Sequence, residues 1–218
     1  MSTAQWIGRV VRPLVMVLGV VPLLVLVRRF VADDFGANPA EEIEHFTGMT
    51  ALLMLLASLA VTPLRRLTRI NALVRLRKPI GLWAFAYATL HLGCYLVFDQ
   101  SLLWGEILGD ILERPYITVG FSAWLILSAL AATSSAWAIR RLGRRWAPLH
   151  RMVYVAATLG ILHFLWLVKL DATTPVALGF VLVALFIYRL PRRRATAPGP
   201  SASAPIEEAP TVTRFNSS

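Results

Sequence analysis

The sequence predicts an all-α integral membrane protein, arranged as a bundle of about six transmembrane helices. Of its 218 residues, 57% are hydrophobic and 16% are charged. Soluble domains typically carry about 25% charged residues, so the chain is depleted in charge. The hydrophobic residues also form long blocks, and a helix needs about 20 of them to cross a hydrocarbon core of about 30 Å. Together these observations exclude an ordinary water-soluble globule.

Six apolar blocks account for the predicted spans. They cover residues 13–27, 46–61, 79–98, 115–139, 152–168 and 172–188. The first block is short and ends in Arg28 and Arg29, whose charges can reach the interface while their stems stay in apolar surroundings. The predicted organisation is therefore a cytoplasmic N-terminus over 1–12, a transmembrane domain over 13–190 and a tail over 191–218.

Basic residues are distributed unevenly over the predicted loops. The N-terminal segment, the second and fourth loops and the tail hold 18 of the 22 Lys and Arg residues, which predicts that these segments face the cytoplasm. Ten of the twelve acidic residues lie in the opposite segments, in agreement with this orientation. Because the basic residues sit in short loops and form no soluble basic domain, we expect contact with membrane lipid and not with nucleic acid.

The tail is rich in Ala, Pro, Ser and Thr and cannot bury enough apolar surface to order itself, so we expect it to be disordered. It is also too short for a folded nucleotide- or flavin-binding domain. No GxGxxG or P-loop pattern precedes a predicted helix elsewhere. Any chemistry is therefore expected in the four histidines.

His91 and His163 are predicted to lie at the same depth in the membrane. His91 is eight residues, or about 12 Å, from the outer end of the third span, and His163 is six residues, or about 9 Å, from the outer end of the fifth. Two neutral imidazoles that face each other across a bundle can supply both axial ligands of a haem iron. The sequence therefore predicts haem between the third and fifth spans.

Two other interpretations of this pair stay open. In the first, each histidine only forms a hydrogen bond to a neighbouring helix, as polar side chains in membranes commonly do. The matched depth, with Gly93 and two small alanines nearby, favours haem over that interpretation. A metal ion without porphyrin is disfavoured, because zinc takes three or four protein ligands and no further Cys or carboxylate lies at this depth.

The other two histidines lie near the ends of predicted spans. His150 precedes His163 by thirteen residues, or about 19.5 Å, on the same helix, so it would serve a second redox centre near the inner face. Beside several arginines, it would equally suit contact with phospholipid headgroups. His45 follows an acidic loop, and we interpret it as a cap or surface residue, with a role at an outer docking face as the lesser alternative.

Several stretches of the chain resemble the MsrQ family. They are EEIEHFTG, LAVTPLRRL, KPIGLWAFAYATLHLGCYLVFD, RPYITVGFSAWLILSALAATSS and WAPLHRMVYVAATLGILHFLWLVK. This family is the haem-binding membrane subunit of the bacterial periplasmic methionine sulfoxide reductase system and belongs to the ferric-reductase-like transmembrane group. The resemblance covers about residues 13 to 190. It implies a bacterial inner-membrane protein that binds haem b, with His91, His150 and His163 as the haem-associated, metal-binding positions.

The resemblance also implies a function. The family passes electrons from the quinone pool or a cytoplasmic flavin reductase to a periplasmic molybdenum-cofactor subunit, which reduces methionine sulfoxide in oxidised proteins. The membrane subunit would then have no substrate-reducing site of its own. FMN has been associated with such subunits, and Arg77, in a cluster with Arg75 and Lys78, would attract its phosphate.

One departure from the wider group bears on the number of haems. Two-haem members carry a pair of histidines, thirteen or fourteen residues apart, on each of two helices. Counting back from His91 gives Lys78 and Arg77, and neither can ligate iron while protonated. One haem is therefore expected, and a second inner haem would be weak, five-coordinate or replaced by a flavin or quinone site.

A different class of function also remains open. The chain would be a membrane transporter or a structural assembly protein, whose histidines only hydrogen-bond between helices. Against transport, no acidic residue lies within the predicted spans, and no paired broken helices supply an ion path.

Overall fold

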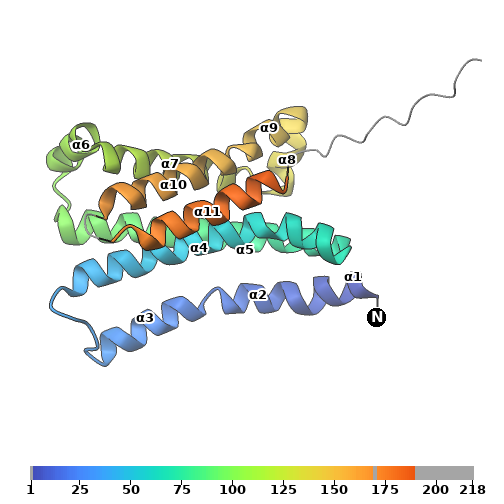
Figure 1. Ribbon diagram of the computed structural model, residues 1–218, viewed down its shortest axis with the longest axis horizontal. Helices are drawn as coiled ribbons and strands as arrows, with labels where there is room; N and C mark the ends of the chain where they lie inside the picture. Colours follow the sequence, from blue (N-terminus) through green and yellow to red (C-terminus); the bar gives the residue numbers. More distant parts are fainter. Residues whose placement is uncertain (1, 169–170, 190–218) are drawn as a thin grey trace, which may run out of the picture.

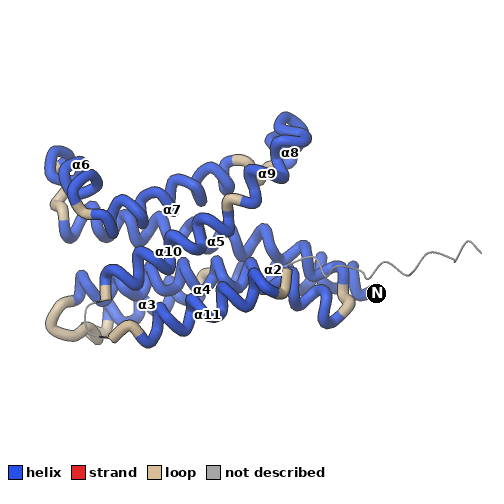
Figure 2. The backbone as a smooth tube through the Cα atoms, turned by 45° about the horizontal axis from the view of Figure 1, so that its top comes forward, coloured by secondary structure: helices blue, strands red, loops and turns tan. Residues whose placement is uncertain are grey.

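The computed structural model describes residues 2–168 and 171–189, and in these residues the secondary structure is helical throughout, without strands. Figures 1 and 2 show the helices lying roughly side by side along one long axis. The predicted all-α membrane fold is confirmed. The predicted disordered tail lies outside the described residues.

The first half of the chain supplies two long antiparallel helical stretches. The first consists of α1 (Thr3–Trp6), η1 (Ile7–Val11), α2 (Arg12–Leu18) and α3 (Val21–Val31), and the second is the single helix α4 (Pro39–Thr68). The side chain of Asn38 accepts a hydrogen bond from the amide of Glu41 at 3.4 Å and so caps α4. Helical structure therefore begins well before the first two apolar blocks.

The second half supplies the remaining helices. These are η2 (Asn71–Leu76), α5 (Arg77–Cys94), η3 (Tyr95–Asp99), α6 (Trp104–Glu113), α7 (Pro115–Ala132), α8 (Ala136–Leu142), η4 (Gly143–Arg145), α9 (Trp146–Arg151), α10 (Val153–Leu167) and α11 (Thr173–Ile187). Among the described residues, five helical stretches are long and apolar enough to cross a membrane, and α11, with 15 residues, is a shorter sixth. The chain is thus a multi-pass membrane protein.

The predicted fourth span, 115–139, is divided in the structure. Helix α7 ends at Ala132, and the hydroxyl of Ser135 accepts the amide of Ala138 at 3.1 Å to start α8. A run of Thr and Ser residues favours such a cap over a continuous helix. The last residues of this apolar block therefore belong to the next helical stretch, which runs from Ala136 to Leu167.

The core lies where α4, α5, α7 and α10 pack together. Small buried side chains at Ala84, Ala156 and Ala157 let the helix backbones approach closely, as is usual in membrane bundles. Leucines of α4 fill the space between these alanines. Large apolar side chains such as Phe180, which is 72% exposed, face outward, where lipid would cover them.

The two ends of the bundle differ in charge. We call the end that carries residues 32–38 and 99–114 the acidic end, and the end that carries 69–76 and 133–145 the basic end. In Figure 1 the acidic end, with α6, lies at the left, and the basic end, with α8 and α9, lies at the right. The N-terminus lies at the basic end.

Candidate functional site

The structure brings His91 of α5 and His163 of α10 together inside the bundle. Their ring centroids lie 6.0 Å apart, and the ring planes are inclined by 75°. Both rings are largely enclosed by α4, α5, α7 and α10. The depth match read from the sequence therefore corresponds to two rings that face each other.

Each ring is held by a hydrogen bond to a backbone carbonyl. The Nδ1 atom of His91 lies 2.9 Å from the carbonyl oxygen of Glu44, and Nδ1 of His163 lies 2.7 Å from that of Tyr116. A carbonyl oxygen only accepts, so both Nδ1 atoms carry the proton. Each Nε2 is therefore left with a free lone pair, which is the arrangement of a metal-binding histidine.

A glycine lies against each ring. A Cβ atom built on Gly48 would lie 3.0 Å from Nδ1 and Cε1 of His91, and one built on Gly120 would lie 2.7 Å from Nδ1 of His163. At Gly120 the approach is closer than a Cβ atom tolerates, and at Gly48 it is tight enough that the ring of His91 would have to shift slightly. Glycine at each position therefore leaves the ring in its observed place. The sequence analysis missed both glycines.

The two half-sites repeat each other along the chain. In both, the residue whose carbonyl accepts the hydrogen bond precedes the histidine by 47 residues. Glu44, Gly48 and His91 in the pair α4 and α5 correspond, 72 residues later, to Tyr116, Gly120 and His163 in the pair α7 and α10. The same offset takes Lys78 to His150. The repeat involves too few residues to appear as sequence similarity. The equal spacing from Gly48 to His91 and from Gly120 to His163 is the signal that would have revealed it.

A cavity of about 1070 Å³ surrounds the two rings. Its walls are apolar, with side chains such as Leu52, Leu55 and Phe121, and its polar residues gather near the acidic end. Pockets for cofactor-sized ligands usually measure about 300–1,000 Å³. The site thus combines two free imidazole nitrogens with an apolar chamber of cofactor size.

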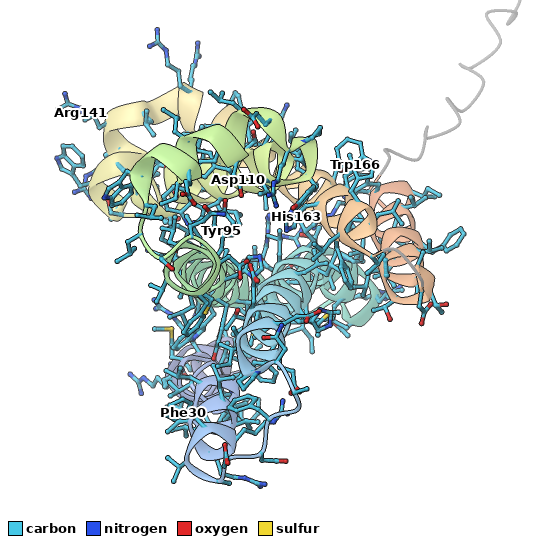
Figure 3. The ribbon with its side chains drawn as sticks, turned by 90° about the vertical axis from the view of Figure 1, so that its left-hand side faces the viewer. Phe30, Tyr95, Asp110, Arg141, His163 and Trp166 are labelled. Atoms are coloured by element: carbon cyan, nitrogen blue, oxygen red, sulfur yellow. The ribbon has the colours of Figure 1, made fainter. Side chains whose placement is uncertain are left out.

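A hydrogen-bond network connects residues at the rim of this cavity at the acidic end. The carboxylate of Asp110 accepts from Gln100 Nε2 at 2.6 Å and from the Tyr95 hydroxyl at 3.2 Å, and it pairs with Arg114 Nε at 3.1 Å. Arg114 also donates to the hydroxyl of Tyr116 at 3.2 Å. Figure 3, viewed from this end, shows Tyr95, Asp110 and His163 near the centre of the bundle. The network joins α6 to η3 and α7.

His45 lies exposed at the rim, on the interior of α4 and not at its cap, which is Asn38. Its ring contacts that of Phe164 at 5.7 Å between centroids. The part of the prediction that placed His45 at a helix cap is therefore wrong, because α4 begins six residues earlier, whereas its surface position holds.

His150 lies at the basic end, away from the cavity. Its Nε2 atom lies 3.1 Å from the hydroxyl of Thr133, and its ring stacks on Trp146 with 4.1 Å between centroids. Neither His150 nor Arg77 lines the cavity around His91 and His163. The structure therefore separates two candidate regions, one around His91 and His163 and the other around His150.

Arg77 lies near His150 and also near Arg189. Arg77 begins α5, and its charge acts on both His150 and Arg189. In the described part of the chain, the buried Nε atoms of Arg77 and Arg189 have no hydrogen-bond partner. Arg189 donates to the Tyr154 hydroxyl and to a carbonyl of α4. The sequence analysis missed Arg189, which follows the last span and gives no local signal.

The predicted cluster of Arg75, Arg77 and Lys78 does not form as a unit. Arg75 is exposed and donates to the carbonyl of Ala4 at 2.9 Å, whereas the Nε of Arg77 is buried. The two residues lie on different sides because a 3₁₀ turn leads into α5 between them. Arg77 is therefore the member of the predicted cluster that faces the second site.

The fold and the paired histidines place the chain among membrane proteins related to ferric reductases. Residues 47–161 match the family described as ferric reductase like transmembrane component. The chain is 48% identical over 159 residues, 73% of each chain, to the protein-methionine-sulfoxide reductase heme-binding subunit MsrQ of Xanthomonas axonopodis pv. citri (strain 306). It is 45% identical over 200 residues to the MsrQ subunit of Bordetella pertussis (strain Tohama I), which covers 89% of this chain and 97% of that one. The chain belongs to the MsrQ family.

Proposed function

We propose that the chain is a haem b electron-transfer subunit of a methionine sulfoxide reductase system, in which His91 and His163 would hold the haem iron. The observation that carries the proposal is the pair of facing imidazoles whose Nε2 atoms are free. The names of the relatives, which are heme-binding subunits of such a system, support it.

The residues present fit this cofactor. Ring centroids about 6 Å apart would leave room for one metal atom between the two imidazoles. The observed separation is 6.0 Å. The apolar walls suit the faces of a porphyrin, and glycines at positions 48 and 120 leave room beside the rings.

Haem, when bound, supplies reversible one-electron chemistry. The chain's own contribution is to hold both Nδ1 protons on carbonyl oxygens, so that each imidazole stays neutral and correctly oriented. The largely apolar walls would limit the access of water, and the network around Asp110 links residues of the rim at the acidic end. In this mechanism the residues bind and position the electron carrier and reduce no substrate themselves.

The direction of transfer follows from the proposed orientation. The basic end faces the cytoplasm and the acidic end faces the periplasm of a bacterial inner membrane, by the positive-inside rule. Both termini are then cytoplasmic. Electrons enter from the quinone pool or a cytoplasmic flavin reductase and leave toward a periplasmic molybdenum-cofactor methionine sulfoxide reductase. Acidic residues around 33–44 and 99–113 form the docking face for that partner.

The entry site lies at the basic end, around Arg77 and His150. Buried guanidinium nitrogens without partners suit an anion, and the Nε atoms of Arg77 and Arg189 are of this kind. We assign this site to FMN or to a reduced quinone, with Arg77 on the anionic group. A second haem fits less well, because the position equivalent to His150 in the other half-site is Lys78.

Removing either axial ligand tests the proposal. His91→Ala and His163→Ala should each abolish the haem absorbance of the purified protein, because no neighbouring side chain replaces the lost nitrogen. His45→Ala, at the rim, should leave the spectrum unchanged. Full haem content and a normal spectrum in both ligand variants would show that the pairing is wrong. A wild-type protein that purifies without haem would favour the transporter or assembly-protein alternative.

A further inference from the structure

The rim of the cavity carries an uneven distribution of charge that bears on the haem of the proposed function. Among the described residues that line the cavity, Arg114 is the sole Lys or Arg. Glu44 and Asp99 line it as well, but they come from α4 and η3. Arg114 comes from the connection between α6 and α7. The positive side of the rim is therefore set by α7 and the negative side by α4 and η3.

The directions of the helices reinforce this difference. Helix α7 begins at the acidic end with Pro115, whereas α5 and α10 run toward the same end and finish near it. The N-terminus of a helix carries a partial positive charge and its C-terminus a partial negative charge. An anionic group at this rim is consequently favoured beside Arg114 and disfavoured beside the ends of α5 and α10.

Two neighbouring side chains orient Arg114 and leave some of its N–H donors available to a ligand. Its Nε atom pairs with Asp110, and its Nη1 atom donates to the hydroxyl of Tyr116. A guanidinium has five N–H donors, so several remain. Its side chain is 55% exposed, whereas that of Asp110, which does not line the cavity, is 17% exposed. Asp110 thus holds Arg114 from behind, and the remaining donors are available to a ligand.

Arg114 is also linked directly to an axial histidine. Tyr116 accepts Nδ1–H of His163 through its carbonyl and accepts from Arg114 through its hydroxyl. The guanidinium therefore lies at the depth of the proposed haem, on the α7 side. Haem carries two propionate carboxylates on one edge, and a guanidinium binds carboxylates through paired charge-assisted hydrogen bonds.

We propose that Arg114 binds the propionate carboxylates of the haem and so fixes which edge of the macrocycle faces the acidic end. This inference rests on the proposed function. The propionate edge lies toward the α6 and α7 side of the rim. The opposite side, with Glu44 and Asp99, offers a carboxylate no Lys or Arg partner among the described residues that line the cavity, and it receives an apolar edge.

The test compares haem with haem dimethyl ester, in which both carboxylates are esterified. The full chain, produced without haem and held in lipid nanodiscs, is loaded with either compound and the two affinities are measured by absorbance. Arg114→Gln should weaken the binding of haem by about tenfold, the value of one charge-assisted contact, and should leave the binding of the ester unchanged. Arg114→Lys keeps the positive charge but not the paired N–H donors of the guanidinium. It should therefore recover part of the difference in affinity between haem and its ester.

Two matched variants serve as controls. Arg28→Gln removes a guanidinium at the same end that pairs with Asp34 and does not line the cavity, so it should bind both compounds as the wild type does. Asp110→Asn loosens the same rim network but keeps Arg114, so it should still distinguish haem from its ester. In haem that Arg114→Gln retains, the midpoint potential should fall, because an uncompensated carboxylate stabilises the ferric form.

The outcomes separate the two proposals. A wild-type protein that binds neither compound would overturn the proposed function. A wild type that binds haem, together with an Arg114→Gln variant that still distinguishes haem from the ester by the wild-type ratio, would overturn the role of Arg114 alone. Equal loss of haem and ester in Arg114→Gln and Arg114→Lys would assign the residue to the rim structure and likewise overturn the proposal.

Discussion

At the residue scale, the geometry of the central site depends on two glycines and two carbonyl groups. The carbonyls of Glu44 and Tyr116 fix the direction of each ring, and the missing Cβ atoms of Gly48 and Gly120 leave space for the rings. As a result the ring planes stand 75° apart with both Nε2 atoms free. None of the four groups would itself touch iron, so they act as positioning residues.

Gly120→Ala should displace the ring of His163. The added Cβ would lie 2.7 Å from Nδ1, so the ring must move and its hydrogen bond to Tyr116 must lengthen or break. Overpacking of this kind costs about 1–3 kcal/mol. We expect a lower ratio of haem to protein and a shifted haem absorption band, measured on the purified protein.

Gly93→Ala is the matched control for this prediction. Gly93 lies two residues from His91 on α5, but it does not line the cavity as the sequence suggested, and a Cβ atom there meets nothing within 4 Å. This variant should keep its haem and its spectrum, with helix propensity gaining up to about 1 kcal/mol. A Gly120→Ala protein with the same haem content and spectrum as Gly93→Ala would disprove the packing argument.

At the element scale, the break after α7 shapes the basic end. Thr133, just beyond α7, accepts Trp146 Nε1 through its carbonyl at 3.1 Å and contacts His150 through its hydroxyl. The break thus docks α9 on the end of α7 and directs His150 toward the start of α5, where Arg77 lies. A continuous helix over 115–139 would have left this site unformed.

Arg77→Ala and His150→Ala should slow the reduction of the haem by quinol or by reduced flavin. Both residues belong to the proposed entry site, and loss of the guanidinium removes the charge that stabilises the anionic donor. Reduction by dithionite should stay at the wild-type rate, because it does not need this site. Stopped-flow absorbance of the haem measures both.

Arg75→Ala is the control for Arg77→Ala, since it removes the same charge two residues earlier from an exposed side chain that contacts Ala4. The haem of the Arg75→Ala variant should be reduced by every donor at the wild-type rate. If Arg77→Ala and His150→Ala also match the wild type with both donors, electrons enter elsewhere on the basic end.

At the scale of the whole molecule, charge separates along the long axis while the sides of the bundle stay apolar. Of the ten acidic residues outside the tail, those of 33–44 and 99–113 lie at the acidic end (Figure 1). Part of this charge is paired within the chain, since Arg29 Nη2 lies 2.6 Å from Glu42 Oε2. The basic end has no comparable acidic partners among the described residues.

This asymmetry predicts the orientation in the membrane. Alkaline phosphatase fused after Glu106 should be active, because that position is expected in the periplasm, and a fusion after Arg194 should be inactive. Equal expression of both fusions, checked by immunoblot, makes the comparison valid. The reverse pattern of activities would invert the proposed direction of electron transfer.

Much of the fold was predictable from the sequence, because it depends on local properties. Hydrophobic block length predicts helices that span a membrane, and the rise of about 1.5 Å per residue places His91 and His163 at one depth. The all-α membrane fold and the membership of the MsrQ family are confirmed. The ligand roles of the histidines stay predictions, although the two rings do face each other.

Other features were decided only when helices distant in the sequence packed together. The sequence by itself determined where the apolar spans lie, roughly how deep His91 and His163 lie and which segments carry the basic residues. Tertiary structure decided that Gly48 and Gly120 touch the rings and that Arg77 lies near Arg189 while Arg75 turns away. It also decided that Arg114 is the one Lys or Arg, among the described residues, that reaches the cavity. The physical reason is that helical periodicity describes one segment at a time, whereas contacts between side chains depend on the rotation and separation of neighbouring helices, which small residues and backbone carbonyls set jointly.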